Sequence, residues 1–599
     1  MTFSTLASYF EKISATTSRL IITRVLADLF SHLEKDEIQN AIYLLQGRVV
    51  PLFEKVEFGM AEKMVVRSAC MGLNVDKKQF EQYLKKFGDL GNAVYHFKNE
   101  QPSLHEKDLS VTEVHARLKN IAQAGGDGSQ ERKIAALAGL IQELSPFGCK
   151  YIVRIPVGSM RLGFSDMTIL DAYSWMLTGD KTHRPLIEKA YHVRPDLGFI
   201  GKELKRAGLK SISTINPELF TPIIMMRAER LSSSKEIIDK LGECIVESKY
   251  DGFRLQIHYR KKTGEVRLYS RNLEDVSFMY PDVIEGIIKE IKADEIIIEG
   301  EAVGFDPYTG NFLPFQETVQ RKRKYDIAAK AKEIPLKLFV FELLYLNGKN
   351  NLTVPYRDRR DKMEKVIKVT GNIRKDVILV SPEQRISDEK KLEQLFDESI
   401  SKGLEGIIAK KMNGIYQPGA RGWNWIKFKR SYSSKIEDTI DCVVMGYDFG
   451  KGKRATFGIG AFLVGIYSEK ADTFLTVAKI GTGLTDIEWT ELAKRAKKYR
   501  EKEKPKEYEV DKMMSVDVWI QPKIVVEIKA DEITRSSVHT AGRVLKTSKS
   551  GNAMDIETAG FALRFPRLVR FRDDKKATDS TSLREISNMY KDQNKRMSS

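Results

Sequence analysis

The stretch Glu247-Ser-Lys-Tyr-Asp-Gly-Phe-Arg254 places one lysine, Lys249, where a predicted strand gives way to a turn. Apolar Ile245 and Val246 lead into it, and an Asp-Gly pair, which is a turn signal, follows it. Taken alone, Lys249 is most simply a solvated surface charge, since the chain has 99 Lys and Arg residues. A lysine fixed between a buried strand and a turn can instead act as a nucleophile. The surrounding sequence decides between these interpretations.

The residues after this stretch predict a mixed α/β domain. Apolar and polar residues alternate over 253–259, as in a half-buried strand, and Lys261-Lys-Thr-Gly-Glu265 predicts a turn into a second strand over 266–270. Further apolar runs predict central strands at 296–298, 336–345 and 406–409. We therefore predict that residues 217–430 form one α/β domain.

The flanking regions have different patterns. Residues 1–216 predict an all-α domain, because apolar residues recur at helical spacing, as in Leu6, Tyr9, Phe10 and Ile13. Residues 431–585 predict a small β-barrel of the oligonucleotide-binding (OB) type, because their strand signals are short and punctuated by glycine. The predicted strands are 442–447, 460–467, 474–480, 516–520 and 524–528. The polar residues 586–599 are expected to form a flexible tail.

Composition and charge limit the class of protein. A chain of 599 residues that is 42% hydrophobic and 30% charged predicts three or four globular domains. The net charge of +17 indicates a polyanionic partner, with nucleic acid favoured over an anionic membrane surface. Four widely spaced cysteines argue against a zinc knuckle and a disulfide-rich secreted domain. Without a signal-peptide pattern or an apolar run of about 18 residues, we expect a soluble intracellular protein with no membrane contact.

The chemistry expected of Lys249 sets a requirement on its surroundings. No G-x-x-x-x-G-K-[ST] sequence occurs in the chain, so a nucleotide site of the P-loop type is excluded. A lysine that attacks phosphorus must be neutral, whereas the free side chain has a pKa of about 10.4. Lowering that pKa by ~3 units requires roughly 4 kcal/mol, which partial burial and a neighbouring cation such as Arg254 can supply.

Other charged residues follow the predicted strands of the α/β domain. Glu299 and Glu301 lie on one face of a strand, where paired carboxylates can bind a ribose hydroxyl or a hard cation such as Mg²⁺, although Glu299 is also compatible with a structural edge pair. Lys427 and Lys429 likewise share one face, which suits phosphate binding but is also found on ordinary basic sheets. Phe341, within an apolar strand, is by itself most simply a core residue.

Several segments resemble, in the same order, the motifs of ATP-dependent DNA ligases. In the helical region, Gly128–Lys133 and Ser159–Gly163 look like parts of the DNA-binding domain of archaeal and eukaryotic replicative ligases. The lack of a long N-terminal extension favours the archaeal form. One departure is Pro222-Ile-Ile-Met-Met-Arg-Ala228, which lacks the second proline and the basic residue usual before the nucleotide-binding core. The motif-like segments are Lys249–Arg254, Leu268–Asp275, Ile298–Val303, Phe339–Gly348, Leu404–Lys410, Arg421–Lys429 and Arg564–Arg567.

The resemblance implies a role for each matched residue. Lys249 is the catalytic residue that accepts AMP, and Phe341 stacks on the adenine. Arg271 points to the ribose or phosphate, Lys427 reaches the α-phosphate and Arg421 a more distal group. The segment Arg564–Arg567, on a mobile barrel domain, orients the pyrophosphate. The implied nucleotide-binding residues are Glu247, Arg254, Arg271, Glu301, Phe341, Arg421 and Lys427, and the implied metal ligands are Glu301 and Glu405.

The resemblance also implies partners. ATP and Mg²⁺ are the expected cofactors, with Mn²⁺ as a substitute for Mg²⁺, and nicked double-stranded DNA is the substrate in replication, recombination and repair. The protein is expected to be a monomer in the cytoplasm, associated with the nucleoid. Gln101-Pro-Ser-Leu104 resembles the start of a peptide that binds a sliding clamp, but it lacks the aromatic pair.

Two other functions remain open at this point. An RNA ligase or an mRNA capping nucleotidyltransferase shares the lysine-based core, although the large helical domain and Arg564–Arg567 favour a DNA ligase. A non-catalytic DNA-binding scaffold could retain the fold. NAD-dependent ligases are disfavoured, because the zinc-binding cysteine cluster of those enzymes is missing.

Overall fold

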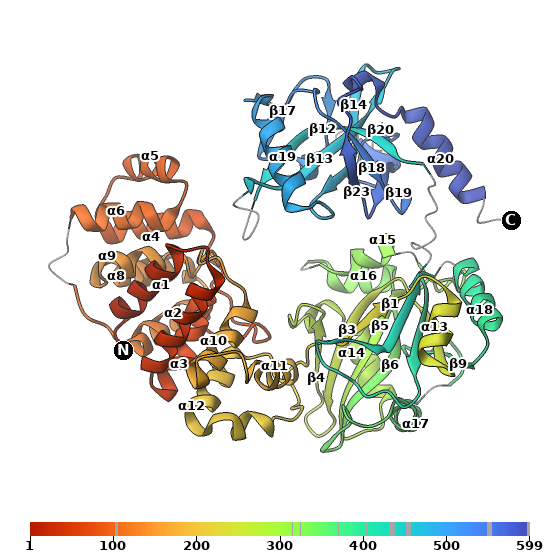
Figure 1. Ribbon diagram of the computed structural model, residues 1–599, viewed down its shortest axis with the longest axis horizontal. Helices are drawn as coiled ribbons and strands as arrows, with labels where there is room; N and C mark the ends of the chain where they lie inside the picture. Colours follow the sequence, from red (N-terminus) through yellow and green to blue (C-terminus); the bar gives the residue numbers. More distant parts are fainter. Residues whose placement is uncertain are drawn as a thin grey trace.

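The computed structural model of the chain contains a helical N-terminal region, a central α/β region and a sheet-rich C-terminal region (Figure 1). The part of the chain that it describes is residues 1–101, 106–313, 315–323, 325–368, 370–402, 404–429, 438–450, 457–547 and 554–595. The predicted boundary at 430/431 and most of Gln101–Leu104 therefore lie outside the described residues.

The N-terminal region is all α, as predicted. Its helices share one hydrophobic core, which extends from Phe3 to Ile212. Side chains cap the N-termini of several of these helices. At the start of α7, for example, the Ser110 side chain accepts from the Glu113 N–H and the Glu113 side chain accepts from the Ser110 N–H, which is a capping box. The helices are α1 (Phe3–Ser14), α2 (Arg19–His32), α3 (Lys35–Leu45), α4 (Glu62–Leu73), α5 (Lys77–Phe87), α6 (Leu90–Glu100), α7 (Val111–Gln123), α8 (Ser129–Glu143), α9 (Pro146–Ile152), α10 (Asp166–Thr178), α11 (Arg184–Val193) and α12 (Leu197–Ser213).

The central region contains two sheets that pack face to face. Ile297 and Leu344 of one sheet share a core with Trp425 of the other. The first sheet has the order β1 (Arg227–Arg230), β11 (Arg421–Lys429), β10 (Gly406–Lys411), β2 (Cys244–Lys249), β9 (Glu383–Ile386). The second has the order β4 (Glu265–Ser270), β3 (Phe253–Arg260), β5 (Glu295–Gly304), β6 (Leu336–Leu346), β7 (Lys349–Asn350), with β8 (Ile378–Val380) paired to β6.

Helices cover the outer faces of these sheets, so that the site described below lies between the sheets. Helices α13 (Ser234–Leu241) and α18 (Glu389–Ser401) pack on the first sheet, and α14 (Pro281–Glu290) and α17 (Tyr356–Val366) on the second. The strands predicted at 266–270, 296–298, 336–345 and 406–409 lie within β4, β5, β6 and β10, which confirms the mixed α/β prediction. The remaining elements are η1 (Ser277–Met279), α15 (Phe315–Thr318), η2 (Val319–Arg321) and α16 (Ile327–Glu333).

The C-terminal region is rich in sheet. Strands β23 (Arg567–Phe571), β18 (Val525–Lys529), β12 (Ile440–Phe449), β13 (Ile459–Ser468), β14 (Thr473–Ile480) and β16 (Tyr508–Glu509) pair in that order. The predicted strands 442–447, 460–467 and 474–480 lie within β12, β13 and β14, and those at 516–520 and 524–528 overlap β17 and β18. The barrel type stays a prediction. The other elements are β15 (Arg500–Glu501), β17 (Val518–Ile520), β19 (Glu532–Ser536) with β22 (Gly560–Arg564), β20 (Val544–Thr547) with β21 (Met554–Thr558), α19 (Asp486–Lys497), η5 (Lys512–Met514), η6 (Ala577–Asp579) and α20 (Leu583–Lys595).

The structure corrects the prediction of a flexible tail from residue 586. Helix α20 extends to Lys595, and its Ile586 is fully buried in the C-terminal core. The side chain of Gln593 accepts from the Ile533 N–H at 2.8 Å and donates to the Ile533 carbonyl at 2.9 Å. This paired hydrogen bond anchors the helix to β19, a contact that the polar composition of the segment does not reveal.

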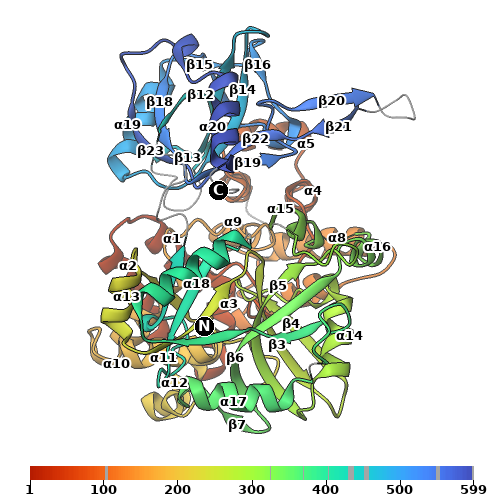
Figure 2. The same ribbon diagram turned by 90° about the vertical axis from the view of Figure 1, so that its right-hand side faces the viewer.

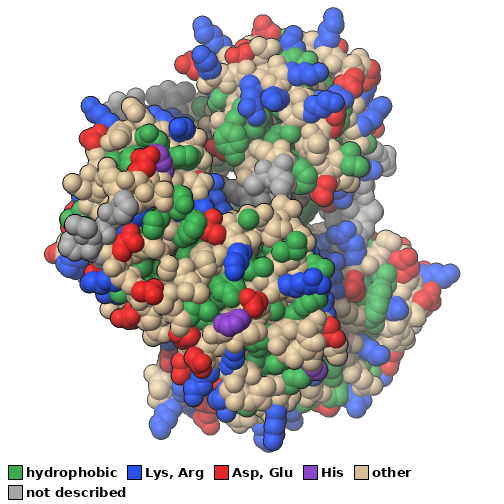
Figure 3. Space-filling view, turned by 60° about the vertical axis from the view of Figure 1, so that its left-hand side comes forward, with side chains coloured by type: hydrophobic (Ala, Val, Ile, Leu, Met, Phe, Trp, Pro, Cys, Tyr) green, Lys and Arg blue, Asp and Glu red, His purple; other side chains and the backbone are tan. Residues whose placement is uncertain are grey.

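Two surface features accompany this fold. The β20–β21 ribbon projects from the C-terminal region (Figure 2). In the view of Figure 3, Lys and Arg side chains are interspersed with Asp and Glu, and several gather on the C-terminal region at the top.

Among the described helices, none has the length and apolar character needed to cross a membrane.

Candidate active site

Lys249 ends β2 at the point where the chain turns from the first sheet to the second. The turn residue Gly252 lies so close to β5 that a Cβ there would be 2.2 Å from the Ala302 carbonyl oxygen. Glycine is therefore required for the turn to lie this close to β5. The Lys249 side chain is 21% exposed, so its Nζ is neither fully solvated nor sealed off.

Glu405 connects Lys249 to the neighbouring strands. Its Oε2 lies 2.6 Å from the Lys249 Nζ and 2.5 Å from the Lys429 Nζ, and its N–H donates to the Lys249 carbonyl at 3.0 Å. Burial alone would raise the pKa of Glu405, but the positive charges of Lys249 and Lys429 outweigh it and hold this pKa below its ordinary value. Glu405 is therefore an ionised carboxylate between two lysines.

Glu301 and Glu299 occupy neighbouring positions on β5 but have different environments. Burial raises the pKa of Glu301 to about 7, although Lys249 and Arg254 act in the opposite direction. Glu299 is fully buried and accepts from Arg254 Nη2 at 2.5 Å and from Tyr416 Oη at 2.9 Å. The sequence left open that Glu299 forms a structural pair at the edge of the sheet, but β5 lies between β3 and β6 and is not an edge strand. Glu299 instead holds Arg254 in place.

Phe341 lies on β6 between cationic side chains. The Arg254 guanidinium lies 5.2 Å and the Lys410 Nζ 5.3 Å from the centre of its ring, and Trp425 meets the ring edge-on at 6.0 Å. Lys410 also donates to the Phe341 carbonyl at 2.8 Å and to Glu247 Oε1 at 2.6 Å. Phe341 is only partly buried, so it has free ring surface, unlike a fully enclosed core residue.

Glu247 was predicted to bind the nucleotide directly. Its carboxylate is 3% exposed and accepts from Lys410 and, at 2.5 Å, from the Tyr356 hydroxyl. These internal partners occupy Glu247, and the geometry instead fits a role in orienting Lys410.

Lys427 and Arg421 lie on β11, which pairs with β1. Burial, followed by the charges of Lys429 and Arg230, lowers the pKa of Lys427 to about 8. No carboxylate of the described residues forms an ion pair with Lys427, so an anionic ligand would relieve this repulsion. Arg421 begins the strand and is exposed. These residues can bind phosphate at two separate positions along one strand.

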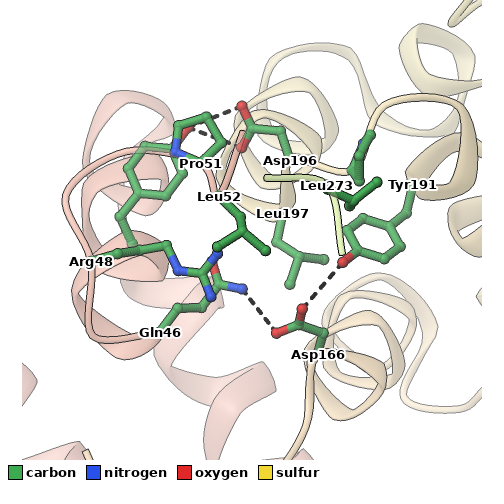
Figure 4. A pocket seen from close by; sticks show the side chains of 11 residues that line it. Gln46, Arg48, Pro51, Leu52, Asp166, Tyr191, Asp196, Leu197 and Leu273 are labelled. Carbon is green, nitrogen blue, oxygen red and sulfur yellow. Dashed lines mark hydrogen bonds between the residues drawn. The ribbon is translucent and has the colours of Figure 1, made fainter. Parts of the chain in front are cut away.

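The structure does not join Arg271 to this cluster. Arg271 is exposed in the turn after β4, and within the described residues it has no hydrogen bond or ion pair. Leu273 of the same turn, at φ +67°, lines a small cavity of the helical region (Figure 4). In this cavity Asp166 accepts from Gln46 at 2.9 Å and from Tyr191 at 3.2 Å. The turn that carries Arg271 is thus held at the junction with the helical region.

The C-terminal region contributes Arg564 to the site. Its guanidinium contacts Asp251 at 3.3 Å, Glu405 at 3.6 Å and, within its own region, Glu532 at 2.9 Å. Burial and a hydrogen bond with Glu405 raise the pKa of Asp251 to about 6, while Arg564 opposes this shift. In the sequence, Asp251 was only a turn signal, and the pairing of Arg564 with a residue 313 positions away gives no local pattern.

The acidic residues of the site fit Mg²⁺. The described residues contain no group of three or more His, Cys, Asp or Glu placed to hold a metal alone. Mg²⁺ is commonly held by one or two carboxylates, with substrate phosphates and water completing its coordination. Glu301 and Glu405 match this requirement, since a divalent cation would relieve the repulsion among Glu301, Glu405 and Asp251.

Comparisons with known proteins agree with this geometry. Three family models match the chain: "DNA ligase N terminus" over residues 2–174, "ATP dependent DNA ligase domain" over 225–429 and "ATP dependent DNA ligase C terminal region" over 455–575. The second match contains Lys249, Arg254, Glu301, Phe341, Glu405 and Lys427, and the third contains Arg564.

Similar proteins match along their full length. A "Probable DNA ligase" of Dictyoglomus turgidum is 45% identical over 596 residues, covering 99% of this chain and 98% of the relative. A "DNA ligase" of Hyperthermus butylicus is 41% identical over 618 residues, covering 100% of this chain and 98% of the relative. A solved structure named "Pmar-Lig_PreS3" matches 95% of this chain and 99% of its own with a TM-score of 0.52; at 16% identity this likeness concerns the fold alone.

Proposed function

The chain belongs to the ATP-dependent DNA ligases, and from this premise we propose that Lys249 is the nucleophile of its adenylylation step. As a member of this family it is an enzyme that forms phosphodiester bonds and seals nicks in duplex DNA. RNA ligation, mRNA capping and a purely structural role are not favoured. The observation that carries the assignment of Lys249 is its position 2.6 Å from Glu405, with Arg564 reaching the same carboxylate from another region.

The reaction has three phosphoryl transfers. In the first, Lys249, a cation paired with Glu405 in the structure, gives up a proton and its amine attacks the α-phosphorus of ATP. A P–N bond forms, the P–O bond to pyrophosphate breaks and the nitrogen loses a second proton. In the second, an oxygen of the 5′-phosphate at the nick attacks the same phosphorus, and the lysine leaves and regains a proton. In the third, the 3′-hydroxyl attacks the activated 5′-phosphate, AMP leaves and the nick is closed.

The other side chains bind and orient the reacting groups. Phe341 offers the accessible part of its ring to the adenine, and Arg254, held by Glu299, lies beside Glu301 at the ribose. Lys427 meets the α-phosphate, Arg421 and Arg564 the distal phosphates, and Glu247 orients Lys410. We assign Arg271 to a ribose or phosphate contact on the side of the site that faces the DNA, since its turn lies at the junction with the helical region. Mg²⁺ at Glu301 and Glu405 would neutralise developing charge on the phosphoryl oxygens.

We further propose that the helical region binds the nicked duplex and that the C-terminal region is an OB-type barrel. The net charge of +17 supports contact with DNA, and the strand pairing in the C-terminal region is compatible with a small closed sheet. We place the enzyme, as a monomer, in the cytoplasm with the nucleoid. Clamp binding through Gln101–Leu104 stays a prediction.

Labelling with α-³²P-ATP tests this function. With Mg²⁺, the protein should acquire acid-labile AMP and should then seal a nicked duplex; chelation of the metal should abolish labelling, and Mn²⁺ should restore it. The same assay with GTP, and with nicked RNA in place of DNA, separates the alternatives. Labelling from GTP alone would indicate a capping enzyme, and a protein that never takes up label would be a scaffold.

Replacing Phe341 by Ala should weaken ATP binding more than DNA binding. Base–aromatic stacking contributes about 1–3 kcal/mol, so the KM for ATP in self-adenylylation should rise by roughly ten- to a hundredfold. Nick affinity, measured by gel shift, should be unchanged. Phe278→Ala is a matched aromatic control, since its ring lies in the same domain against Lys55 of the helical region. An unchanged ATP dependence in Phe341→Ala would remove Phe341 from the adenine site.

A further inference from the structure

Helix α11 of the helical region ends against the loop that leads into β11, residues 416–421, here called the entry loop. The imidazole of His192 lies flat against Gly419 of this loop: a Cβ on Gly419 would be 2.6 Å from His192 Cδ2 and 2.7 Å from Cγ. Gly419 also has φ +67°, which favours glycine. The contact thus requires both a flat ring on the helix and the absence of a side chain on the loop.

Hydrogen bonds extend this contact along the backbone. The Ile224 N–H donates to the His192 carbonyl at 2.9 Å, and the Gly419 N–H donates to the Ile224 carbonyl at 2.9 Å. Burial lowers the pKa of His192, while the Glu188 carboxylate, 3.6 Å from its Nε2, and a hydrogen bond to the Pro418 carbonyl oppose this shift. Three segments that are distant in sequence are therefore fastened together at His192.

The same segments continue into the nucleotide-binding side of the domain. The Tyr416 hydroxyl, at the start of the entry loop, donates to Glu299 at 2.9 Å and accepts from the Met226 N–H at 2.8 Å. Arg254 donates to the Met226 carbonyl at 2.8 Å. These hydrogen bonds, together with the short backbone segments 224–226 and 416–419 that connect them, join the end of α11 to the residues that hold Arg254.

Packing follows the same route. Val193, next to His192, is buried in one core with Tyr416 and Trp425, and Phe341 packs against that core. At the other end of the entry loop, Arg421 begins β11, which carries Lys427 and Lys429. A shift of the loop would therefore displace both the wall behind Phe341 and the first cation of the strand.

We propose that His192 is a positioning residue for the adenylylation step: it holds the entry loop so that Arg421 and the wall behind Phe341 meet ATP. The proposal rests on the roles assigned above to Arg421 and Phe341. It makes the helical region, whose main task is DNA binding, a part of the ATP-binding apparatus. It also gives a function to Pro222–Ala228, the segment that departs from the family pattern, because this segment carries the connection.

The test compares His192→Ala with Lys189→Ala, an exposed residue of the same helix, in the full-length protein. His192→Ala should lower kcat/KM for ATP in self-adenylylation by about tenfold, because small displacements of positioning groups have effects of this size or larger. Nick affinity and the sealing of a pre-adenylylated nick should remain within about twofold of the unchanged protein. His192→Phe keeps a flat ring against Gly419 and should recover most of the loss, whereas Lys189→Ala should have no effect.

Gly419→Ala approaches the same contact from the loop and should reproduce the defect of His192→Ala. Melting curves for each variant identify any that fail to fold. Normal ATP dependence in His192→Ala overturns the inference, as does an equal loss of nick binding or of sealing, which would indicate a general structural role. Arg421→Ala tests the proposed function separately. If this variant is labelled normally, the role assigned to Arg421 is wrong. The His192 variants still decide whether the contact between His192 and Gly419 affects the use of ATP.

Discussion

Lys249→Ala should abolish self-adenylylation and leave the affinity for nicked DNA unchanged. Removal of a nucleophile that forms the covalent intermediate has an effect on the order of 10⁶-fold in enzymes where it has been measured, so no label should be detected. Lys249 is the last residue of β2, and its side chain is partly exposed although it contacts Glu405. Its truncation therefore leaves no large buried cavity. The measurement is labelling with α-³²P-ATP, paired with a gel shift on a nicked duplex.

Two further variants separate nucleophilicity from charge. Lys249→Arg keeps a cation beside Glu405, but a guanidinium does not deprotonate near neutral pH and should not accept AMP. Lys261→Ala, in the exposed turn between β3 and β4, should label normally. Acid-labile AMP that persists on Lys249→Ala would assign the nucleophile to another residue.

The parts of this site that were predicted from the sequence are those encoded by local patterns. Apolar Ile245 and Val246 and the Asp-Gly turn placed Lys249 at the end of a strand, and the spacing of Glu299 and Glu301 placed both on one face of β5. Lys427 and Lys429 likewise follow from strand alternation. Such patterns depend on neighbouring residues only, and period-two alternation is strong where one face is buried.

The parts that were missed depend on contacts between distant segments. No residue near Asp251 in the sequence predicts that its carboxylate accepts a hydrogen bond from Arg564. Likewise, no residue near Glu299 predicts that its carboxylate accepts one from Arg254. The same applies to Gln593, whose pairing with Ile533 turns an apparently polar tail into a packed helix. In each case a polar side chain is satisfied by a partner that only the tertiary fold supplies, so composition gives the wrong or an incomplete expectation.

Arg564→Ala should lower the rate of self-adenylylation by about 10²- to 10³-fold, because it removes a fixed cation that we assign to the phosphates of ATP. In the structure this guanidinium reaches Asp251 and Glu405 from the C-terminal region and also pairs with Glu532 of its own region. Its loss also removes the cation that opposes the raised pKa of Asp251. The effect should be confined to the step that expels pyrophosphate, since sealing of a pre-adenylylated nick involves no pyrophosphate.

The decisive comparison is therefore between two assays of the same variant: labelling from ATP and closure of a pre-adenylylated nick. Arg564→Lys keeps the charge but not the two-sided geometry that reaches Asp251 and Glu532 together, and it should fall between Ala and the natural residue. Arg570→Ala removes a cation of the same segment that pairs with Glu527 within the C-terminal region, and it should leave labelling unchanged. If Arg564→Ala loses both activities equally, the arginine acts in closure of the domains over DNA, and the assignment to the phosphates of ATP is wrong.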